Sequence, residues 1–578
     1  MSWVIKEALN KILDQEEGYI TFPAGQRTPF ALVYPNSYHV GMSNLGIHIL
    51  YKLLNERKDI ACKRFFLPEK KFEAEFIKTN TPLLSLETQM PLHKFPLIGI
   101  SISFEMDYFN IIKILDMGKV KIFAKDRSDM DPIVIAGGPC ATFNPEPLSD
   151  FIDVFVIGEG ENTVQELMDV YFSAIDQGLS RDEVLLSFTK IPGVYIPKFY
   201  RHQLNENNQL TVIHLTSVPE KVTRQWVENL DDFDAQSVIF TDKTEFGGLC
   251  LLEIARGCGR HCRFCMAGYC FRKPRTRSLE KLKVNLEEIK KVGKKVGLMG
   301  AAISDYPEVD ALCKDILGLD MSMSVASLRA DSFTNDLADS LAKSGLKTIT
   351  LAPEAGSEKL RNVINKGINE EDLFRAINIA VNAGIKNLKL YIMIGLPFET
   401  DDDIEEIIKM AKKIKDYREK LNCRGTITLS INPFIPKPFT PFQWLPMDDL
   451  KNIDYKLKQI KQSLKGIKGI EIIMESPKEA YVQGILARGD RRVGKAIYDA
   501  YQLGGSKKLK VSLEQNGLED SFYLYRTRDK DEVFPWETLD MGFTKQYLYD
   551  ELLKAAEQKK TIKCFDGCNR CGVCKHSE

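Results

Sequence analysis

Short apolar runs alternate with amphipathic segments over residues 1–190 of the chain. The apolar runs predict strands at 29–34, 97–103, 132–136 and 153–157. The amphipathic segments predict helices at 43–55 and 105–117. Strands that alternate with glycine turns and helices are typical of a parallel sheet with helices on both faces. We therefore predict that residues 1–190 form a doubly wound α/β domain.

A second alternation begins at residue 248 and continues to about residue 470. Strands are predicted at 251–256, 296–300, 321–326, 347–352, 387–394 and 426–432. Helices are predicted at 279–292, 307–317, 334–344, 370–383, 401–421 and 446–465. Six strand–helix units are fewer than the eight of a closed (β/α) barrel, so we predict an open, partial barrel over 248–470.

Two stretches lie outside these alternations. Residues 191–247 are polar and irregular, and we predict a linker or a small β extension there. Residues 471–578 are predicted to form a mainly helical extension, with a strand-like piece at 522–527 and a last helix at 544–558.

Composition and charge narrow the class of protein. Of the 578 residues, 44% are apolar and 28% are charged, which excludes disordered, collagenous and coiled-coil chains. The near balance of 79 basic and 80 acidic residues argues against electrostatic binding of nucleic acid by the protein as a whole. No apolar run reaches the ~18 residues needed to cross a bilayer, and residues 1–18 lack the basic-then-apolar shape of a secretory signal. We therefore expect a cytoplasmic protein without a membrane partner.

The thirteen cysteines are more informative. Disulfides rarely persist in a reducing cytosol. We therefore expect small buried apolar roles for the six cysteines that lie apart from one another: Cys62, Cys140, Cys250, Cys270, Cys313 and Cys423. The other seven form two tight clusters, which in a cytosolic chain indicates metal binding.

The first cluster consists of Cys258, Cys262 and Cys265, at the end of the first barrel strand. Three thiolates at these spacings can converge on one metal centre from a single loop. Three ligands are too few for a closed tetrahedral site, whereas an iron–sulfur cube held by three cysteines keeps one iron open for a substrate or cofactor. The active sites of β/α barrels lie on the loops that follow the strands. The alternative is a zinc site with His261 as fourth ligand, although a histidine beside a ligating cysteine has awkward geometry for the same metal.

The spacing CxxxCxxC, with Phe264 directly before the third cysteine, resembles the radical S-adenosylmethionine (SAM) superfamily. Further matching segments, each after a predicted strand, lie at 299–302, 327–329, 353–357, 391–400 and 432–438. The resemblance implies that the three cysteines bind a 4Fe–4S cluster whose open iron chelates SAM. An electron delivered to the cluster would cleave SAM to methionine and a 5′-deoxyadenosyl radical, which abstracts hydrogen from an unactivated position. We therefore expect a low-potential electron donor of the flavodoxin or ferredoxin type as a partner.

The same resemblance places further residues near the cofactor: Phe264, Gly300, Ala301, Ser327, Arg329, Glu354 and Gly395. Gly300 and Ala301 would lie along the methionine part of SAM. Ser327 and Arg329 would approach its carboxylate or ribose, because a guanidinium suits bidentate carboxylate binding. The alternative for Arg329 and Glu354 is a structural ion pair inside the barrel.

The domain of residues 1–190 resembles the cobalamin-binding, Rossmann-type domain that precedes many radical SAM barrels. The matching glycine turns lie at 41–46, 137–139 and 158–161. By this resemblance Gly41, Gly137 and Gly138 would let the backbone approach the cofactor, and the alternative is that the glycines only make tight turns. The DxHxxG motif that supplies a histidine to cobalt is absent, and His39 is expected to be a partly buried turn histidine.

The second cluster consists of Cys564, Cys568, Cys571 and Cys574. Four thiolates suffice for a tetrahedral zinc site or for a complete 4Fe–4S cube. The tail that carries them is too short to form its own core, so we predict a metal-stabilised lobe beside the barrel. Iron–sulfur is favoured over zinc because the chain already carries one such cluster. With this ending, nearly the whole chain resembles a sparsely characterised family of cobalamin-binding-type radical SAM proteins.

A basic stretch follows the first cluster, with Arg272, Lys273, Arg275 and Arg277. These residues could guide a phosphate-bearing substrate to the barrel mouth. A solvated face is the favoured interpretation.

These patterns favour a radical SAM enzyme that transfers a methyl group from methylcobalamin to an unactivated carbon. One alternative is radical sulfur insertion, as in methylthiotransferases, with the second cluster as sulfur source. Another is a non-catalytic module whose zinc knuckle recognises RNA or protein, although the intact CxxxCxxC argues against it. The wide mouth of a partial barrel could admit a macromolecule, but it does not choose between RNA, protein and a small molecule as substrate.

Overall fold

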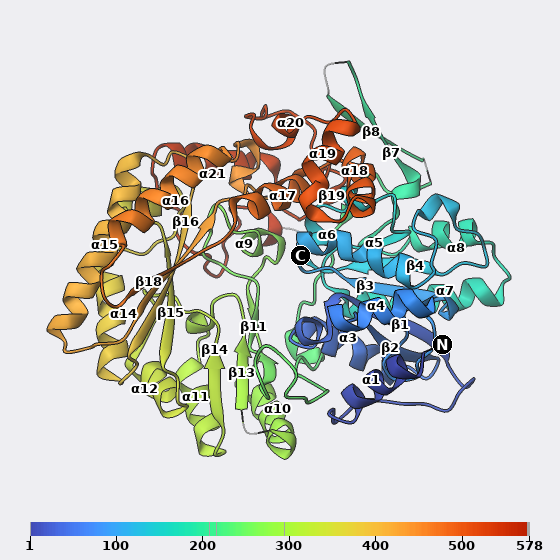
Figure 1. The fold of residues 1–578 in the computed structure, drawn as a ribbon, viewed down its shortest axis with the longest axis horizontal. Helices are drawn as coiled ribbons and strands as arrows, with labels where there is room; N and C mark the ends of the chain where they lie inside the picture. The colour runs from blue at the N-terminus through green and yellow to red at the C-terminus, as the bar shows by residue number, and fades with distance from the viewer. Residues whose placement is uncertain (1, 207–208, 216, 294, 575–578) are drawn as a thin grey trace.

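The computed structural model describes residues 2–206, 209–215, 217–293 and 295–574 (Figure 1). An N-terminal unit, drawn blue to cyan, lies beside a barrel drawn green to yellow. The C-terminal helices, drawn orange to red, lie across one end of both.

The N-terminal unit is built on a six-stranded sheet in the order β2-β1-β3-β4-β5-β6. The strands are β1 (Thr28–Ser37), β2 (Ile60–Leu67), β3 (Leu97–Ser101), β4 (Ile133–Gly137), β5 (Val154–Val156) and β6 (Val194–Tyr195). The first five pair in parallel, and β6 runs antiparallel to β5. The main covering helices are α3 (Leu45–Glu56), α5 (Tyr108–Met117) and α7 (Gly160–Asp176).

Both faces of this sheet are buried, as a doubly wound fold requires. Along β1, Phe30 and Leu32 belong to the hydrophobic cluster that contains residues of α3 and α7. Ala31 and Val33 belong to the cluster that contains residues of α5. Alternate residues of one strand therefore face two cores, and the predicted doubly wound unit is confirmed.

The apolar pattern does not predict β2, because Lys63 and Arg64 interrupt it. Arg64 is fully buried, and its guanidinium pairs with Glu16 at 2.6 Å and with Glu87 at 2.6 Å. Its charge is thus balanced inside the fold by partners that are distant in the sequence. A strand of this kind has no apolar signature.

The barrel is an arc of parallel strands: β10 (Cys250–Glu253), β13 (Lys295–Met299), β14 (Ser322–Val325), β15 (Thr348–Glu354), β16 (Asn387–Ile394), β17 (Ile427–Pro433) and β18 (Ile470–Met474). They form two ladders, and a parallel bridge between Leu328 and Leu351 links these ladders. Within the described ranges no ladder joins β18 to β10, so the barrel is open. Its helices are α10 (Leu279–Val292), α11 (Val309–Gly318), α12 (Asn335–Lys343), α14 (Glu370–Asn382), α15 (Asp401–Lys420) and α16 (Leu450–Leu464).

The structure corrects two local predictions. The six predicted barrel strands are present, but β18 continues the sheet by pairing in parallel with β17. Only alternate residues of β18 are partly shielded, so its apolar signal is weak. Residues 522–527 are not a strand: the short helix α20 (Asp520–Leu524) covers the first half and buries Tyr523 and Leu524.

The C-terminal helices α17 (Pro477–Arg488), α18 (Arg492–Gln502) and α21 (Lys545–Ala556) hold the two units together. Nδ2 of Asn144, which follows β4, donates to the backbone oxygen of Ala487 at 3.0 Å. Glu146 pairs with Arg491 at 2.6 Å. The extension therefore fixes the N-terminal unit relative to the barrel.

Residues 191–247 include a small β extension, as expected. Strands β7 (Tyr200–Leu204) and β8 (Leu210–His214) form an antiparallel pair. None of the described helices combines the length and the apolar character that a membrane span needs.

Candidate functional site

A cavity of about 410 Å³ lies between the two units, at the carboxyl ends of the N-terminal strands. On the N-terminal side its walls include Gly46, Ser101, Gly137 and Gly160. On the barrel side they include Ala255, Gly257, Ala267 and Ala301. Gly257 directly precedes Cys258 and Ala267 lies two residues after Cys265, so the cysteine loop, residues 258–265, borders the cavity. Ligands of open parallel sheets bind at this edge.

Gly137 and Gly138 have different roles. A Cβ at Gly137 would meet nothing closer than Cβ of Val156 at 3.7 Å, so this glycine leaves room in the cavity. Gly138 has a φ of +97°, and its Cβ would lie 2.7 Å from the backbone oxygen of Ile102. The fold itself therefore requires glycine at 138, whatever the cavity holds.

Gly41 and the histidines nearby lie away from the cavity. A Cβ at Gly41 would collide with the ring of Phe66 at 2.4 Å, and Gly41 is not among the described lining residues. His39 is exposed on α2 (Tyr38–Gly41) rather than partly buried. His48 is buried on α3, its Nε2 lies 3.1 Å from the backbone oxygen of Met42, and burial lowers its pKa to about 4. No described lining residue is a histidine.

Charged residues from both units meet at the edge of the cavity. Glu159, which follows β5, pairs with Arg256 at 2.9 Å and with Arg275 at 2.6 Å. Burial alone would raise the pKa of Glu159, but the hydrogen bond from Arg275 and the charge of Arg256 outweigh it, and the pKa lies below its usual value. Glu159 is therefore ionised at neutral pH and joins the N-terminal unit to the barrel.

The basic stretch after the cysteine loop is neither a solvated face nor a guide for phosphate. Arg272, Arg275 and Arg277 are buried. Arg277 pairs with Glu253 at 2.9 Å, and the guanidinium of Arg272 lies 4.7 Å from the centre of the Tyr269 ring. The favoured interpretation was wrong because the partners of these arginines lie elsewhere in the chain.

In the cysteine loop Cys262 is buried, and Cys258 and Cys265 are partly exposed. Burial and, next, the charge of Cys262 raise the pKa of Cys265 to about 12, and the same two causes raise that of Cys258. A metal centre must therefore displace thiol protons when it binds.

The arrangement of donors bears on which centre fits. Among the described residues, no three His, Cys, Asp or Glu side chains are placed to hold a single metal ion. The thiolates of an iron–sulfur cube bind separate irons and lie farther apart than the ligands of one ion. Three soft thiol donors on one loop at the edge of a cavity are a donor set suited to an iron–sulfur cube.

Two buried cations lie beside Cys262. Arg329, which follows β14, donates to Asp331 at 2.9 Å and to the backbone oxygen of Lys366 at 2.8 Å. Lys366 pairs with Glu354 at 3.0 Å. The alternative of an ion pair between Arg329 and Glu354 is therefore wrong, since each has another partner.

The remaining residues expected near SAM are spread over the ends of the barrel strands: Phe264, Gly300, Ala301, Ser327 and Gly395. The ring of Phe264 lies 5.9 Å below Nζ of Lys366. Ala301 lines the cavity and Ser327 is exposed. Gly395 does not line the cavity; it lies in a turn after β16, where its N–H donates to Glu399 at 2.8 Å.

The sequence pattern does not predict two residues beside the cysteine loop. Lys366 lies in the segment NKG after α13 (Glu358–Val363), which carries no motif, and only the fold brings it to Cys262. Asp331 could have been found, because an acid two residues after Arg329 is a ready partner for a guanidinium.

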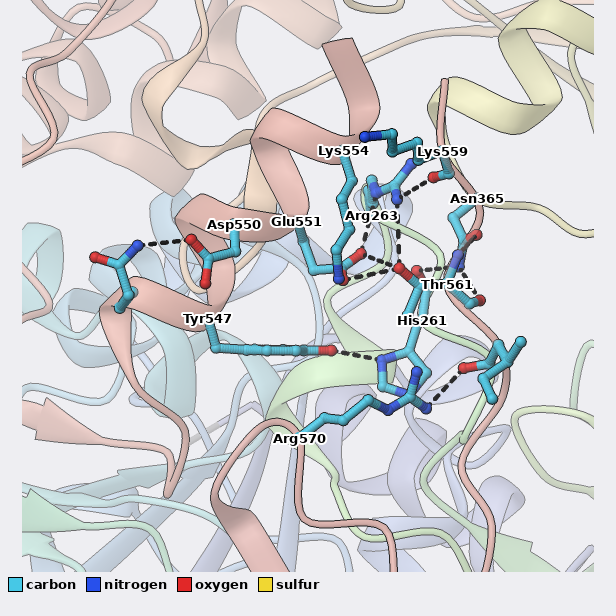
Figure 2. A network of polar contacts seen from close by, with 12 residues as sticks. His261, Arg263, Asn365, Tyr547, Asp550, Glu551, Lys554, Lys559, Thr561 and Arg570 are labelled. Carbon is cyan, nitrogen blue, oxygen red and sulfur yellow. Dashed lines mark hydrogen bonds and ion pairs between the residues drawn. The ribbon is translucent and has the colours of Figure 1, made fainter. Parts of the chain in front are cut away.

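The C-terminal segment, residues 557–574, is fastened to the cysteine loop (Figure 2). Arg263 is fully buried, donates to the backbone oxygen of Lys559 at 2.7 Å and pairs with Glu551 of α21 at 3.2 Å. Asn365 donates to the backbone oxygen of Thr561 at 3.0 Å, and the N–H of Thr561 donates back at 2.8 Å.

His261 faces the second cysteine cluster rather than the first. Its Nδ1 lies 2.6 Å from the hydroxyl of Tyr547, and its Nε2 lies 3.1 Å from Sγ of Cys564 (Figure 2 shows the contact with Tyr547). The N–H of Cys564 donates to the backbone oxygen of Gly259 at 2.8 Å. The zinc alternative for the first cluster thus loses its fourth ligand.

Comparisons with known proteins agree with this geometry. The family described as "Radical SAM proteins, N-terminal" matches residues 46–197, and the radical SAM superfamily matches residues 252–411. These ranges cover most of the N-terminal sheet and most of the barrel.

Among relatives, the uncharacterized protein MJ0966 of Methanocaldococcus jannaschii is 34% identical over 504 residues, which are 86% of this chain and 96% of that protein. The uncharacterized methyltransferase PH0819 of Pyrococcus horikoshii is 29% identical over 305 residues, which are 50% of this chain and 59% of that protein. Among solved structures, the cobalamin-dependent SAM radical enzyme OxsB with aqua-cobalamin and SAM bound is 14% identical, with a TM-score of 0.48 over 92% of this chain and 79% of that one. With its cysteine loop at the mouth of an open barrel, the chain belongs to the radical SAM superfamily, in one family with the Methanocaldococcus protein.

Proposed function

We propose that this radical SAM enzyme is a cobalamin-dependent methyltransferase that methylates an unactivated carbon of its substrate. The observation that carries the proposal is the shared cavity. Its walls come from the carboxyl ends of the N-terminal strands and from both flanks of the cysteine loop. A cofactor held there by the N-terminal unit would lie within reach of a radical formed in the barrel.

The walls of the cavity suit a large, flat cofactor. Leu45, Ile49 and Val156 make them apolar, and a Cβ at Gly160 would meet no atom closer than 3.5 Å. The lack of a described lining histidine agrees with the missing DxHxxG motif, so the protein would offer no imidazole to cobalt. Bound there, cobalamin would supply a carrier for the methyl group.

The barrel residues suit SAM. A 4Fe–4S cluster on the cysteine loop would supply the electron that SAM cleavage needs. Burial alone would lower the pKa of Lys366, but the charges of Glu354 and Cys262 outweigh it, and the pKa lies above its usual value. Lys366 and the fixed guanidinium of Arg329 therefore offer positive charge for the carboxylate of SAM.

Sulfur insertion has less support. It requires the second cysteine cluster to deliver sulfur to the substrate. None of the described residues that line the cavity belongs to the C-terminal segment. The second cluster therefore has no access to a substrate held in the cavity.

Cobalamin binding tests the proposal. In Gly137→Leu the new side chain would fill the cavity without meeting the backbone, so we expect about tenfold weaker retention of hydroxocobalamin in equilibrium dialysis. Gly318→Leu is the matched control, because a Cβ at the end of α11 meets nothing within 4 Å. The bound form should show an absorption spectrum without histidine coordination. A wild-type protein that retains no cobalamin would overturn the proposal.

A further inference from the structure

The C-terminal segment buries two of its four thiols and exposes two of its large apolar side chains. Cys568 and Cys571 are buried, whereas Ile562 and Phe565 expose 66% and 57% of their surface. In the described chain no named helix or strand follows α21. Cys571 and Val573 are its only described residues in the main hydrophobic core, so little apolar burial orders the segment, and metal ligation is the usual supplement.

The segment touches the cysteine loop between two of the loop's own cysteines. Gly259 and His261 lie between Cys258 and Cys262, and both contact Cys564. A Cβ at Gly259 would come within 3.2 Å of Cβ of Cys564, so no side chain separates the cysteine loop from the C-terminal segment there. Two metal centres held on these segments would be close enough to exchange an electron directly.

The described part of the C-terminal segment does not line the cavity. None of the described lining residues comes from the C-terminal segment, although both flanks of the cysteine loop are represented. A centre on this segment therefore meets the catalytic cluster from outside the cavity. Its possible roles are to support the loop or to bring electrons to it.

The surface of the segment favours electron delivery. Lys559, Lys560 and Lys563 are exposed, and the guanidinium of Arg570 lies 5.8 Å from the ring centre of the exposed Phe565. Cys574 is exposed on the same segment. Lys559 pairs with Glu557 at 2.7 Å and Asp566 is also exposed, but the basic side chains of the segment outnumber the acidic ones. Such a surface complements a small acidic protein, because opposite charge steers docking.

We propose that Cys564, Cys568, Cys571 and Cys574 hold a second iron–sulfur cluster through which a small acidic one-electron carrier protein reduces the cluster on the cysteine loop. The relay rests on the proposed function in one respect only, namely that the first cluster must be reduced. The carrier loses one electron, the second cluster takes it up and passes it on, and the first cluster is reduced by one electron. No bond forms or breaks and no proton moves.

Iron content tests the second cluster. We expect about eight irons per chain in the reconstituted wild type and about four in Cys568→Ser/Cys571→Ser, since each cube holds four. Cys423→Ser is the control, because Cys423 lies in neither cluster. Zinc in the wild type with about four irons in both proteins would overturn the proposal.

The choice of reductant tests the relay. Dithionite is small enough to reduce the first cluster without docking, whereas reduced flavodoxin must dock. In Cys568→Ser/Cys571→Ser we expect the electron paramagnetic resonance signal of the reduced first cluster to form normally with dithionite and about tenfold more slowly with flavodoxin. Equal rates with flavodoxin in variant and wild type would overturn the relay. This readout needs no SAM cleavage, so it remains decisive even if the proposed methyl transfer is wrong.

Charge reversal tests the docking surface. Lys560→Glu/Lys563→Glu should slow reduction by flavodoxin about tenfold at low salt, with a smaller effect at high salt because ions screen the attraction. Reduction by dithionite should not change. Lys412→Glu/Lys420→Glu, exposed on α15, is the matched control. A variant that is as fast as this control would show that the carrier docks elsewhere.

Discussion

At residue 138 an added methyl group would collide with the protein, whereas at residue 137 it would enter the cavity. The collision is with the backbone oxygen of Ile102, which cannot move aside as a side chain could. We expect Gly138→Ala to lower the free energy of unfolding by about 1–3 kcal/mol, the usual cost of a strained backbone. Urea unfolding measures it, with Gly318→Ala as control. An unchanged midpoint would show that the turn after β4 is less tight than described.

The cysteine loop gives a second prediction at this scale. Cys258→Ala/Cys262→Ala/Cys265→Ala should remove about four irons per chain and abolish dithionite-dependent formation of 5′-deoxyadenosine from SAM. Without these three thiolates the protein cannot hold the 4Fe–4S cluster that binds and cleaves SAM. Cys423→Ala should behave as wild type. Undiminished cleavage in the triple variant would contradict the role of this loop.

Both cysteine sets can be found from the sequence because each lies within a few consecutive residues. Their surroundings cannot, since the partners of Arg263 lie up to 298 residues away along the chain. The alternative of an ion pair between Arg329 and Glu354 likewise names the wrong partners, because no local sequence motif indicates that Lys366 lies beside Glu354.

Among elements, α21 has the largest effect on the site because it carries Glu551. This carboxylate is fully buried and accepts from the hydroxyl of Thr561 at 2.8 Å as well as pairing with Arg263. Glu551→Gln leaves the buried guanidinium of Arg263 without its counter-charge, so we expect the free energy of unfolding to fall by roughly 3–5 kcal/mol. Hydrogen exchange should become faster over 557–574. Asp550 is exposed on the same helix, so Asp550→Asn should change neither the free energy of unfolding nor the rate of hydrogen exchange over 557–574.

Most strands of the two main sheets and the six long barrel helices follow from periodicity alone, to within a few residues at their ends. The failures have physical causes. Strand β2 is buried but lacks a continuous apolar pattern, because it contains Arg64, whose charge is balanced by acids distant in the sequence. The aromatic run at 522–527 suits a strand locally, but packing of Tyr523 and Leu524 in the C-terminal helices selects a helical turn.

At the scale of the whole molecule, Glu159 links the N-terminal unit to the barrel. Its folded pKa lies below the unfolded value of about 4.3, so its contribution to stability is present above that pH and is lost as the pH falls through the folded value. Glu159→Gln should lower the free energy of unfolding by roughly 3–5 kcal/mol at pH 7.

The cost of Glu159→Gln should begin to shrink as the pH falls below about 4.3, where the unfolded carboxyl takes up its proton, and should vanish only below the lower pKa of the folded carboxyl. Urea unfolding of the metal-free protein at several pH values measures it. Glu557→Gln, at an exposed residue, is the control. A difference of constant size at every pH would show that charge is not what Glu159 contributes.

The two α/β units and the openness of the barrel could be predicted because they depend on local alternation of strands and helices. The cavity between the units could not, since it depends on how the C-terminal helices set the N-terminal unit against the barrel. Asn144 and Arg491 make these contacts, and neither belongs to a motif.

The contact between Arg263 and Lys559 also has a consequence for synthesis of the protein. A ribosome adds about 5–20 residues per second, so Lys559, 296 positions after Arg263, is added about 15–60 s later. During that time the cysteine loop exists without Glu551, Thr561 and Lys559, and its buried guanidinium has no partners from the C-terminal part of the chain. The nascent chain therefore cannot complete the site while it is being made. Loading of the loop with metal is best completed after release, when an unfinished polypeptide can no longer generate radicals.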